Sequence, residues 1–92
     1  MKPFDWNEQK NKLLKQTRGI GFENIVNAIN DGHLLAVLDH PNNAKYPNQK
    51  VYIVAIEDYA CAVPFVDNKD TLFLKTIYRS RKYTNLYLKA KD

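Results

Sequence analysis

The chain has 92 residues, with 45% apolar and 26% charged side chains and a net charge of +4, which predicts one globular domain, residues 1–92, with one modest core. No apolar run approaches the ~20 residues of a membrane span, and the N-terminus lacks the apolar stretch of a signal peptide. The single cysteine, Cys61, excludes an internal disulfide and is expected to be a small buried hydrophobe in a cytoplasmic protein.

A helix is expected near the N-terminus, after a short segment over residues 1–6 that reads as a brief strand or an anchored arm. Asn7 is a good N-cap for this helix, and Asp5 competes with it through an Asp-x-x-Glu capping box. The helix is expected to run to about Thr17, because Gly19 follows and glycine commonly ends helices.

A second helix is predicted over residues 22–30. Its apolar residues follow the i, i+3, i+4, i+7 spacing of one buried helix face, and they are Phe22, Ile25, Val26 and Ile29. Two short helices joined by a glycine-containing turn predict a helical hairpin.

Strands are expected in the second half of the chain, over residues 34–39, 50–56, 60–66 and 71–78. Most of their connections are short, which is typical of antiparallel neighbours. The connection over 40–49 is longer and is a candidate functional loop. Pro64 lacks a backbone donor, so it is expected at a bulge or on an unpaired strand side.

This order of elements predicts an α+β fold. The N-terminal helical hairpin is expected to pack on one face of a four-stranded antiparallel sheet, and a short C-terminal helix is expected over about 84–91. The other face of the sheet would then stay uncovered and carry the function.

The last predicted strand and its exit combine apolar and cationic residues. Side chains alternate between the two faces of a strand, so Phe73, Lys75, Ile77 and Arg79 are expected on one side, and Arg81 joins them if the extended conformation continues. A cation on an apolar face is unfavourable unless an anion meets it. This pattern predicts a phosphate-binding floor.

Charge is distributed unevenly along the chain. Residues 1–18, 19–74 and 75–92 carry net charges of +3, −4 and +5. Such asymmetry predicts a nucleic-acid surface if the two basic ends meet in space. The alternative is that lysines at the ends only keep the chain soluble.

Three segments of the chain carry a family resemblance. They are Phe-Asp-Trp-Asn-x-x-Lys-Asn at 4–11, Gly-Ile-Gly-Phe-Glu at 19–23 and Ile-x-x-Ser-Arg-Lys-x-Thr at 77–84. They resemble the signature of BrnT-type toxins, which belong to the RelE/ParE superfamily of bacterial toxin–antitoxin systems. The residues at matching positions are Trp6, Lys10, Phe22, Glu23, Arg81, Lys82 and Thr84.

The sequence also departs from that signature. The Lys-His that follows the family's first helix is replaced by Gln16-Thr17-Arg18, Tyr83 stands where the family has alanine, and Ser80 aligns only with one residue inserted after Ile77. The resemblance covers the chain in element order, and in detail only its two ends.

The resemblance implies an endoribonuclease that cleaves mRNA and inhibits translation. It also implies a cognate DNA-binding antitoxin, of the ribbon-helix-helix or a similar type, that covers the basic face in a hetero-oligomer. Two other functions stay open: a non-catalytic toxin that inhibits a cellular protein, as the gyrase poisons of this superfamily do, and a plain RNA-binding module.

Motifs for metal or cofactor chemistry are missing from the sequence. There is no Gly-rich phosphate loop, no paired His/Cys spacing and no serine nucleophile motif, so neither a metal nor a cofactor is expected. Metal-free RNA cleavage requires activation of the 2′-hydroxyl, stabilisation of the charged phosphorane and protonation of the leaving 5′-oxygen.

The catalytic candidates are cations and one histidine. Arg79 and Arg81, with Lys82 beside them, are candidates for phosphate stabilisation because guanidinium matches phosphate geometry; the alternative is a solvated basic C-terminus or an antitoxin-binding surface. Lys75 is a further candidate, with a lysine extending from an edge strand as its alternative. His40 could act as base or acid, or be a turn residue bonded to nearby backbone.

Other residues are expected to bind RNA without reacting. Tyr46 and Tyr83 could stack on bases, although Tyr83 and Tyr87 have the spacing of an ordinary helical packing pair. Three cations of the first helix are expected to steer RNA or to bind antitoxin: Lys12, Lys15 and Arg18.

Overall fold

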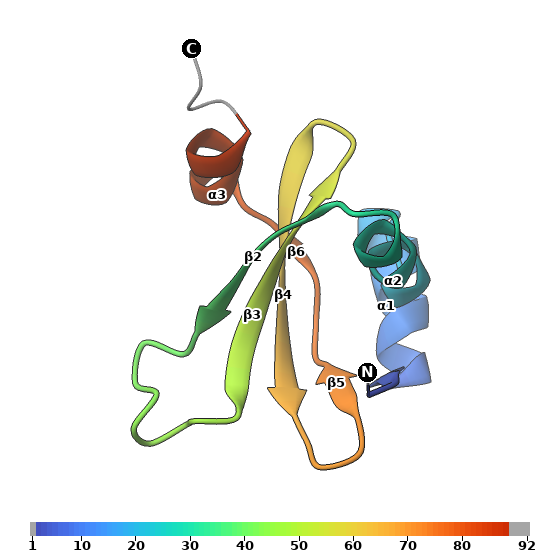
Figure 1. Cartoon of the computed structure of the whole chain (residues 1–92). Helices are drawn as coiled ribbons and strands as arrows, with labels where there is room; N and C mark the ends of the chain where they lie inside the picture. The colour runs from blue at the N-terminus through green and yellow to red at the C-terminus, as the bar shows by residue number, and fades with distance from the viewer. Residues whose placement is uncertain (1, 89–92) are drawn as a thin grey trace.

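The computed structural model of the chain describes residues 2–88, and it has a mixed α/β fold of three helices and a six-stranded sheet (Figure 1). No helix within these residues is long and apolar enough to cross a membrane. The elements in chain order are β1 (Phe4–Trp6), α1 (Glu8–Arg18), α2 (Phe22–Asn30), β2 (Leu34–Asp39), β3 (Gln49–Ile56), β4 (Tyr59–Asp67), β5 (Leu72–Leu74), β6 (Tyr78–Arg79) and α3 (Arg81–Tyr87).

The sheet has the strand order β1-β5-β4-β3-β2, and β6 pairs with β4. The prediction of a four-stranded antiparallel sheet is wrong, because β1 adds a parallel strand in which Phe4 lies opposite Leu72. Leu72 N–H donates to the carbonyl of Pro3 at 2.9 Å. A pairing between residues so distant in the chain leaves no local pattern from which it can be read.

The predicted strand over 71–78 is also wrong as one element, because the chain leaves the ladder between β5 and β6. β4 pairs with β5 through residues 65–67 and with β6 through residues 61 and 62. Pro64 lies opposite the break, where its missing N–H removes a ladder donor. Its carbonyl accepts a hydrogen bond from Lys75 N–H at 2.8 Å.

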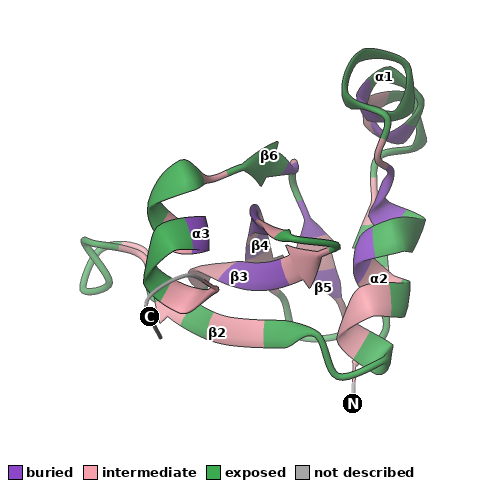
Figure 2. Cartoon of the chain, turned by 90° about the horizontal axis from the view of Figure 1, so that it is seen from above, coloured by how far each residue is buried: buried purple, intermediate pink, exposed green. Residues whose placement is uncertain are grey.

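The two N-terminal helices form, but they are not an antiparallel hairpin. In Figure 1 α1 is seen from the side and α2 from its end, whereas in Figure 2 α1 is seen from its end and α2 from the side. The two helix axes therefore cross. The side chain of Asn7 accepts from Lys10 N–H at 3.0 Å, which confirms Asn7 as the N-cap.

Buried Asn11 explains why the helices cross. Its Oδ1 accepts from Phe22 N–H at 2.7 Å, and its Nδ2 donates to the Glu23 carboxylate at 2.9 Å. The chain after α1 therefore folds back along α1 before α2 begins. Gly21 makes this approach possible, since a Cβ there would lie 2.8 Å from Asn11 Oδ1.

Both faces of the sheet are covered, so the prediction of an uncovered functional face is wrong. α1 and α2 lie on one face and α3 lies on the other (Figure 2). The α1/α2 face holds the larger core, which includes Phe22, Ile25, Phe65, Leu74 and Ile77. The α3 face holds Ile53, Ala60 and Ala62, with Tyr83 and Tyr87 packed against them.

α3 begins at Arg81 rather than at Thr84, and residues 89–91 of the predicted helix lie outside the described residues. Ser80 caps it, because its side chain accepts from Tyr83 N–H at 3.1 Å. The buried hydroxyl of Thr84 accepts from Ala60 N–H at 2.8 Å and donates to the Ser80 carbonyl at 2.7 Å. The Thr84 hydroxyl and the backbone N–H of Ser80, which donates to the Ala60 carbonyl at 2.9 Å, therefore attach the helix to the start of β4.

Candidate functional site

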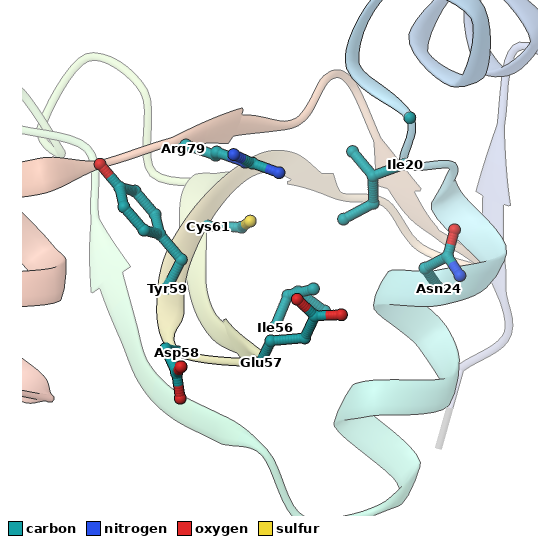
Figure 3. Close-up of a pocket in the computed structure, with 9 residues that line it drawn as sticks. Ile20, Asn24, Ile56, Glu57, Asp58, Tyr59, Cys61 and Arg79 are labelled. Atoms are coloured by element: carbon teal, nitrogen blue, oxygen red, sulfur yellow. The ribbon is translucent and has the colours of Figure 1, made fainter.

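A hollow of about 330 Å³ lies where the β3–β4 turn, β6 and the α1–α2 connection meet (Figure 3). The lining comes from four parts of the chain, so none of the contributing segments forms it alone. Its side chains include Ile20, Asn24, Glu57, Tyr59, Cys61 and Arg79. We call it the turn hollow, after the β3–β4 turn.

A second hollow of about 390 Å³ adjoins the first and shares Ile20 and Arg79 with it. Thr17, Arg18 and Ile77 complete its lining. Two arginines from opposite ends of the chain therefore line one concavity, which we call the arginine hollow. The nucleic-acid surface expected from the charge pattern required the two basic ends to meet in space, and Arg18 and Arg79 meet here.

Arg18 is fixed by a contact that the sequence does not indicate. Its Nη1 donates to the carbonyl of Ile77, just before β6. Ile77 is completely buried, so its backbone is a firm attachment point. Because guanidinium has five N–H donors, this bond holds the group at the hollow and leaves other donors for an anion.

Arg79 is positioned by the pairing of β6 with β4. It lies opposite Cys61 in the ladder, and its Cζ is 5.7 Å from the centre of the Tyr59 ring. A cation near an aromatic ring is attracted by it, and the guanidinium extends across the turn hollow toward Ile20 (Figure 3). Burial raises the pKa of the Cys61 thiol, and the positive charge of Arg79 acts in the opposite direction.

The β3–β4 turn contributes a group that sequence reasoning missed. Glu57 has φ of 57°, in the left-handed region that non-glycine residues rarely adopt. Its carboxylate points into the turn hollow, whereas that of Asp58 points away from it (Figure 3). The sequence had indicated only a tight turn here, because backbone strain at one residue leaves no composition signal.

Lys75, Arg81 and Lys82 are exposed and line neither hollow. The expected sharing of one strand face by Lys75 and Ile77 is wrong, because these residues lie in the break between β5 and β6 and only Ile77 is buried. Arg81 does not continue the parity of Arg79, since α3 begins at Arg81.

His40 and Tyr46 lie in the β2–β3 connection, at the end of the sheet opposite the β3–β4 turn (Figure 1). Their ring centres are 4.7 Å apart. His40 Nδ1 accepts from Asn42 N–H at 3.0 Å. This matches the alternative to a catalytic role, in which His40 is a turn residue bonded to nearby backbone. The structure therefore does not bring His40 together with Arg79.

The remaining RNA-binding candidates are spread over two helices. Lys12 and Lys15 are exposed on α1, and Lys15 pairs with Glu23 at 3.1 Å. Tyr83 is half-buried against the α3-face core, with its ring centre 6.1 Å from that of Tyr87. Tyr83 and Tyr87 therefore form the helical packing pair that was the alternative to base stacking.

No protein-family model, curated protein or solved structure matches the chain. Among residues 2–88, no group of three or more His, Cys, Asp or Glu side chains is arranged to hold a metal ion. The chemistry of the two hollows is therefore inferred from their own side chains, of which the two arginines are the most distinctive.

Proposed function

We propose that the chain is the toxin of a type II toxin–antitoxin system, a cytoplasmic endoribonuclease that cleaves mRNA and inhibits translation. The observation that carries the proposal is the lining of the arginine hollow by both Arg18 and Arg79. Guanidinium binds phosphate oxygens in bidentate fashion. Two such groups at one concavity suit the backbone of a single RNA strand.

The proposed role of the arginines is charge stabilisation. A ribose 2′-hydroxyl loses its proton to water as its oxygen attacks the adjacent phosphorus, which builds negative charge on the phosphorane oxygens. The P–O5′ bond then breaks, the 5′-oxygen takes a proton from water, and a 2′,3′-cyclic phosphate remains. Fixed cations at the phosphorane oxygens lower the barrier, since they need no reorganisation during the reaction. The bond from Arg18 to the Ile77 carbonyl and the contact of Arg79 with Tyr59 supply this fixation.

The test is RNA cleavage by the purified chain, with mRNA alone and with mRNA on ribosomes. Arg79→Ala is expected to lower the cleavage rate about 10²- to 10³-fold, the usual loss when one stabilising donor is removed. Arg81→Ala is the matched control, because it makes the same change outside both hollows, and it is expected to retain activity. Lys75→Ala and His40→Ala are expected to do the same.

Two outcomes would contradict the proposal, one its activity and the other its site. If the wild-type chain cleaves no RNA under either condition, the nuclease activity is wrong. If Arg81→Ala abolishes cleavage and Arg79→Ala does not, the activity stands and the site is wrong. Growth arrest on expression, relieved by a co-expressed DNA-binding partner, would support the toxin–antitoxin assignment independently of the site.

A second candidate function is RNA binding without cleavage. One observation favours it: neither described hollow is lined by a histidine, and His40 lies at the other end of the sheet. A chain of this kind would bind single-stranded RNA with strong salt dependence and leave it intact. Arg79→Ala would then weaken binding, and no cleavage product would form.

A further inference from the structure

The turn hollow differs from the arginine hollow in charge. The arginine hollow is lined by two cations, whereas the turn hollow adds the carboxylate of Glu57 to the shared Arg79. A phosphate group near this carboxylate would be repelled. Where RNA phosphate lies at the arginines, a neutral part of the nucleotide therefore suits the turn hollow better.

The size and walls of the turn hollow fit a nucleobase. Its volume of about 330 Å³ falls at the lower end of the roughly 300–1,000 Å³ of small-molecule sites. Ile20 and Tyr59 line it from opposite sides (Figure 3). Apolar and aromatic side chains are the surfaces on which unpaired bases of RNA stack.

Glu57 supplies hydrogen-bond acceptors to this space. An ionised carboxylate only accepts hydrogen bonds, through two oxygens that suit two adjacent donors. The group belongs to a tight turn between the paired residues Ile56 and Tyr59, so its backbone is fixed by the β3–β4 ladder. Figure 3 shows the carboxylate directed toward the space below Arg79.

Asn24 also lines this space. Its Oδ1 already accepts from Gly21 N–H at 2.9 Å, at the start of α2. This bond leaves Nδ2, which can only donate, for another partner. Asn24 and Glu57 line the turn hollow together; we take the Nδ2 donor and the two carboxylate oxygens as the groups with which a ligand there would bond.

This donor–acceptor pattern distinguishes between the four bases. Guanine presents two adjacent donors, N1–H and the N2 amino group, beside the O6 acceptor. Uracil has one donor between two acceptors, and adenine and cytosine have an amino donor beside a ring-nitrogen acceptor. Only guanine matches a carboxylate through two donors and an amide donor through O6.

We infer that the turn hollow binds a guanine base of single-stranded RNA, with Glu57 accepting from N1–H and N2 and with Asn24 Nδ2 donating to O6. The inference rests on the proposed function, because it takes the adjoining arginine hollow as the phosphate site. The guanine would be the base attached to the nucleotide whose phosphate contacts Arg79. RNA cleaved by this chain would then be cut next to guanine.

The experiment is titration calorimetry of the purified chain with guanosine, inosine and uridine 3′-monophosphates. Wild type is expected to bind the guanosine nucleotide about 5- to 100-fold more tightly than the uridine nucleotide, the discrimination that one bidentate base contact supplies. The inosine nucleotide lacks the N2 amino group and is expected to fall between them.

Glu57→Gln is expected to reduce this preference to less than about threefold, because an amide presents only one acceptor oxygen. Asp58→Asn is the matched control: it removes the same charge from the same turn, but its side chain points away from the hollow. It is expected to keep the preference. Asn24→Asp retains the oxygen that caps α2 and loses the donor, so it is expected to reduce the preference as well.

Equal affinities for the three nucleotides in wild type would overturn the inference, and so would an unchanged preference in Glu57→Gln. The proposed function fails separately. Guanine preference without RNA cleavage would support this site and contradict the nuclease. Cleavage at every base with no guanine preference would contradict this site and leave the nuclease standing.

Discussion

The two faces of the sheet hold their helices in different ways. Among residues 2–88, the face under α1 and α2 buries a cluster of eleven apolar residues, whereas the face under α3 buries three. Two of those three are alanines, Ala60 and Ala62. The small side chains let α3 come close to β4, where Thr84 bonds to the backbone. One face therefore has a large fully buried core, and the other combines a small core, with half-buried side chains packed on it, and a few hydrogen bonds.

This difference has a consequence for the candidate site. Arg18 and the α1–α2 connection are attached to the large core, and Arg79 is in the strand that leads into α3. The arginine hollow thus joins a segment attached to the large core to a segment held by the two-residue pairing of β6, the small core under α3 and the buried Thr84 hydroxyl. Local opening is expected first on the α3 side, because free energies of opening follow the local density of buried contacts.

The largest effect is expected from Phe22→Ala. Phe22 is completely buried, and its ring is stacked on Trp6 with the ring centres 5.6 Å apart. Removing it leaves a cavity in the larger core, so the free energy of unfolding is expected to fall by about 3–5 kcal/mol. Urea denaturation followed by Trp6 fluorescence measures this change.

Leu13→Ala is the control for Phe22→Ala, since Leu13 is 50% exposed on the same pair of helices. It is expected to change the free energy of unfolding by less than about 1 kcal/mol. Equal losses from the two substitutions would mean that apolar burial on this face does not determine stability.

A smaller and more local effect is expected from Thr84→Val. Valine keeps the shape of threonine and removes the hydroxyl, so the N–H of Ala60 loses its partner; the expected loss is about 1–3 kcal/mol. α3 has seven residues and is too short to be stable without docking. Amide hydrogen exchange should therefore speed up in α3 and at Ala60, with little change in α2.

Thr17→Val is the matched control for Thr84→Val. Thr17 is exposed on α1, and its hydroxyl donates only to the Leu13 carbonyl, at 2.8 Å. The free energy of unfolding is expected to change by less than about 0.5 kcal/mol. If Thr84→Val also left exchange in α3 unchanged, the hydroxyl would not be what anchors this helix.

Local periodicity was sufficient to predict some elements and was not sufficient for others. α2 and β2 have the predicted bounds, because an amphipathic helix and a short apolar strand between turn residues each show in a few neighbouring positions. The pairing of β1 with β5 leaves no signal in neighbouring positions, because it joins Phe4 to Leu72. The sheet was therefore predicted with too few strands and only one orientation.

The same limit applies to the candidate site. Arg79 was predicted from its own strand parity, and it does line a hollow. The residues that lie near it depend on tertiary structure. Arg18, at the end of α1, lines the arginine hollow with it, and Glu57, in a strained turn, lines the turn hollow with it. Lys75 and Arg81 were assigned by continuing one strand through positions where the chain breaks from the ladder and then becomes helical.

The smallest expected effect concerns the polar contacts between α1 and α2, in which Asn11 and Lys15 donate to the Glu23 carboxylate. The pKa of Glu23 is lowered, first by the hydrogen bond from Asn11 and then by its own backbone and by Lys15. A carboxyl whose pKa is lower in the folded state stabilises the fold above its unfolded pKa, and this stabilisation is lost as the pH falls through the folded pKa.

Glu23→Gln removes this pH-dependent stabilisation but keeps the size of the side chain. Wild type is expected to be slightly more stable than the variant at pH 7, and the difference should shrink as the pH falls below the ordinary range of a glutamate. The effect is small because the Glu23 side chain is 48% exposed, and water screens exposed ion pairs.

The measurement is the free energy of unfolding at several values of pH, with Lys15→Gln for comparison. Lys15 ranks after Asn11 among the causes, so Lys15→Gln should change the pH dependence less than Glu23→Gln does. A pH dependence in Glu23→Gln identical to that of wild type would mean that the contact between Asn11 and Glu23 sets the crossing of the helices without contributing to acid stability.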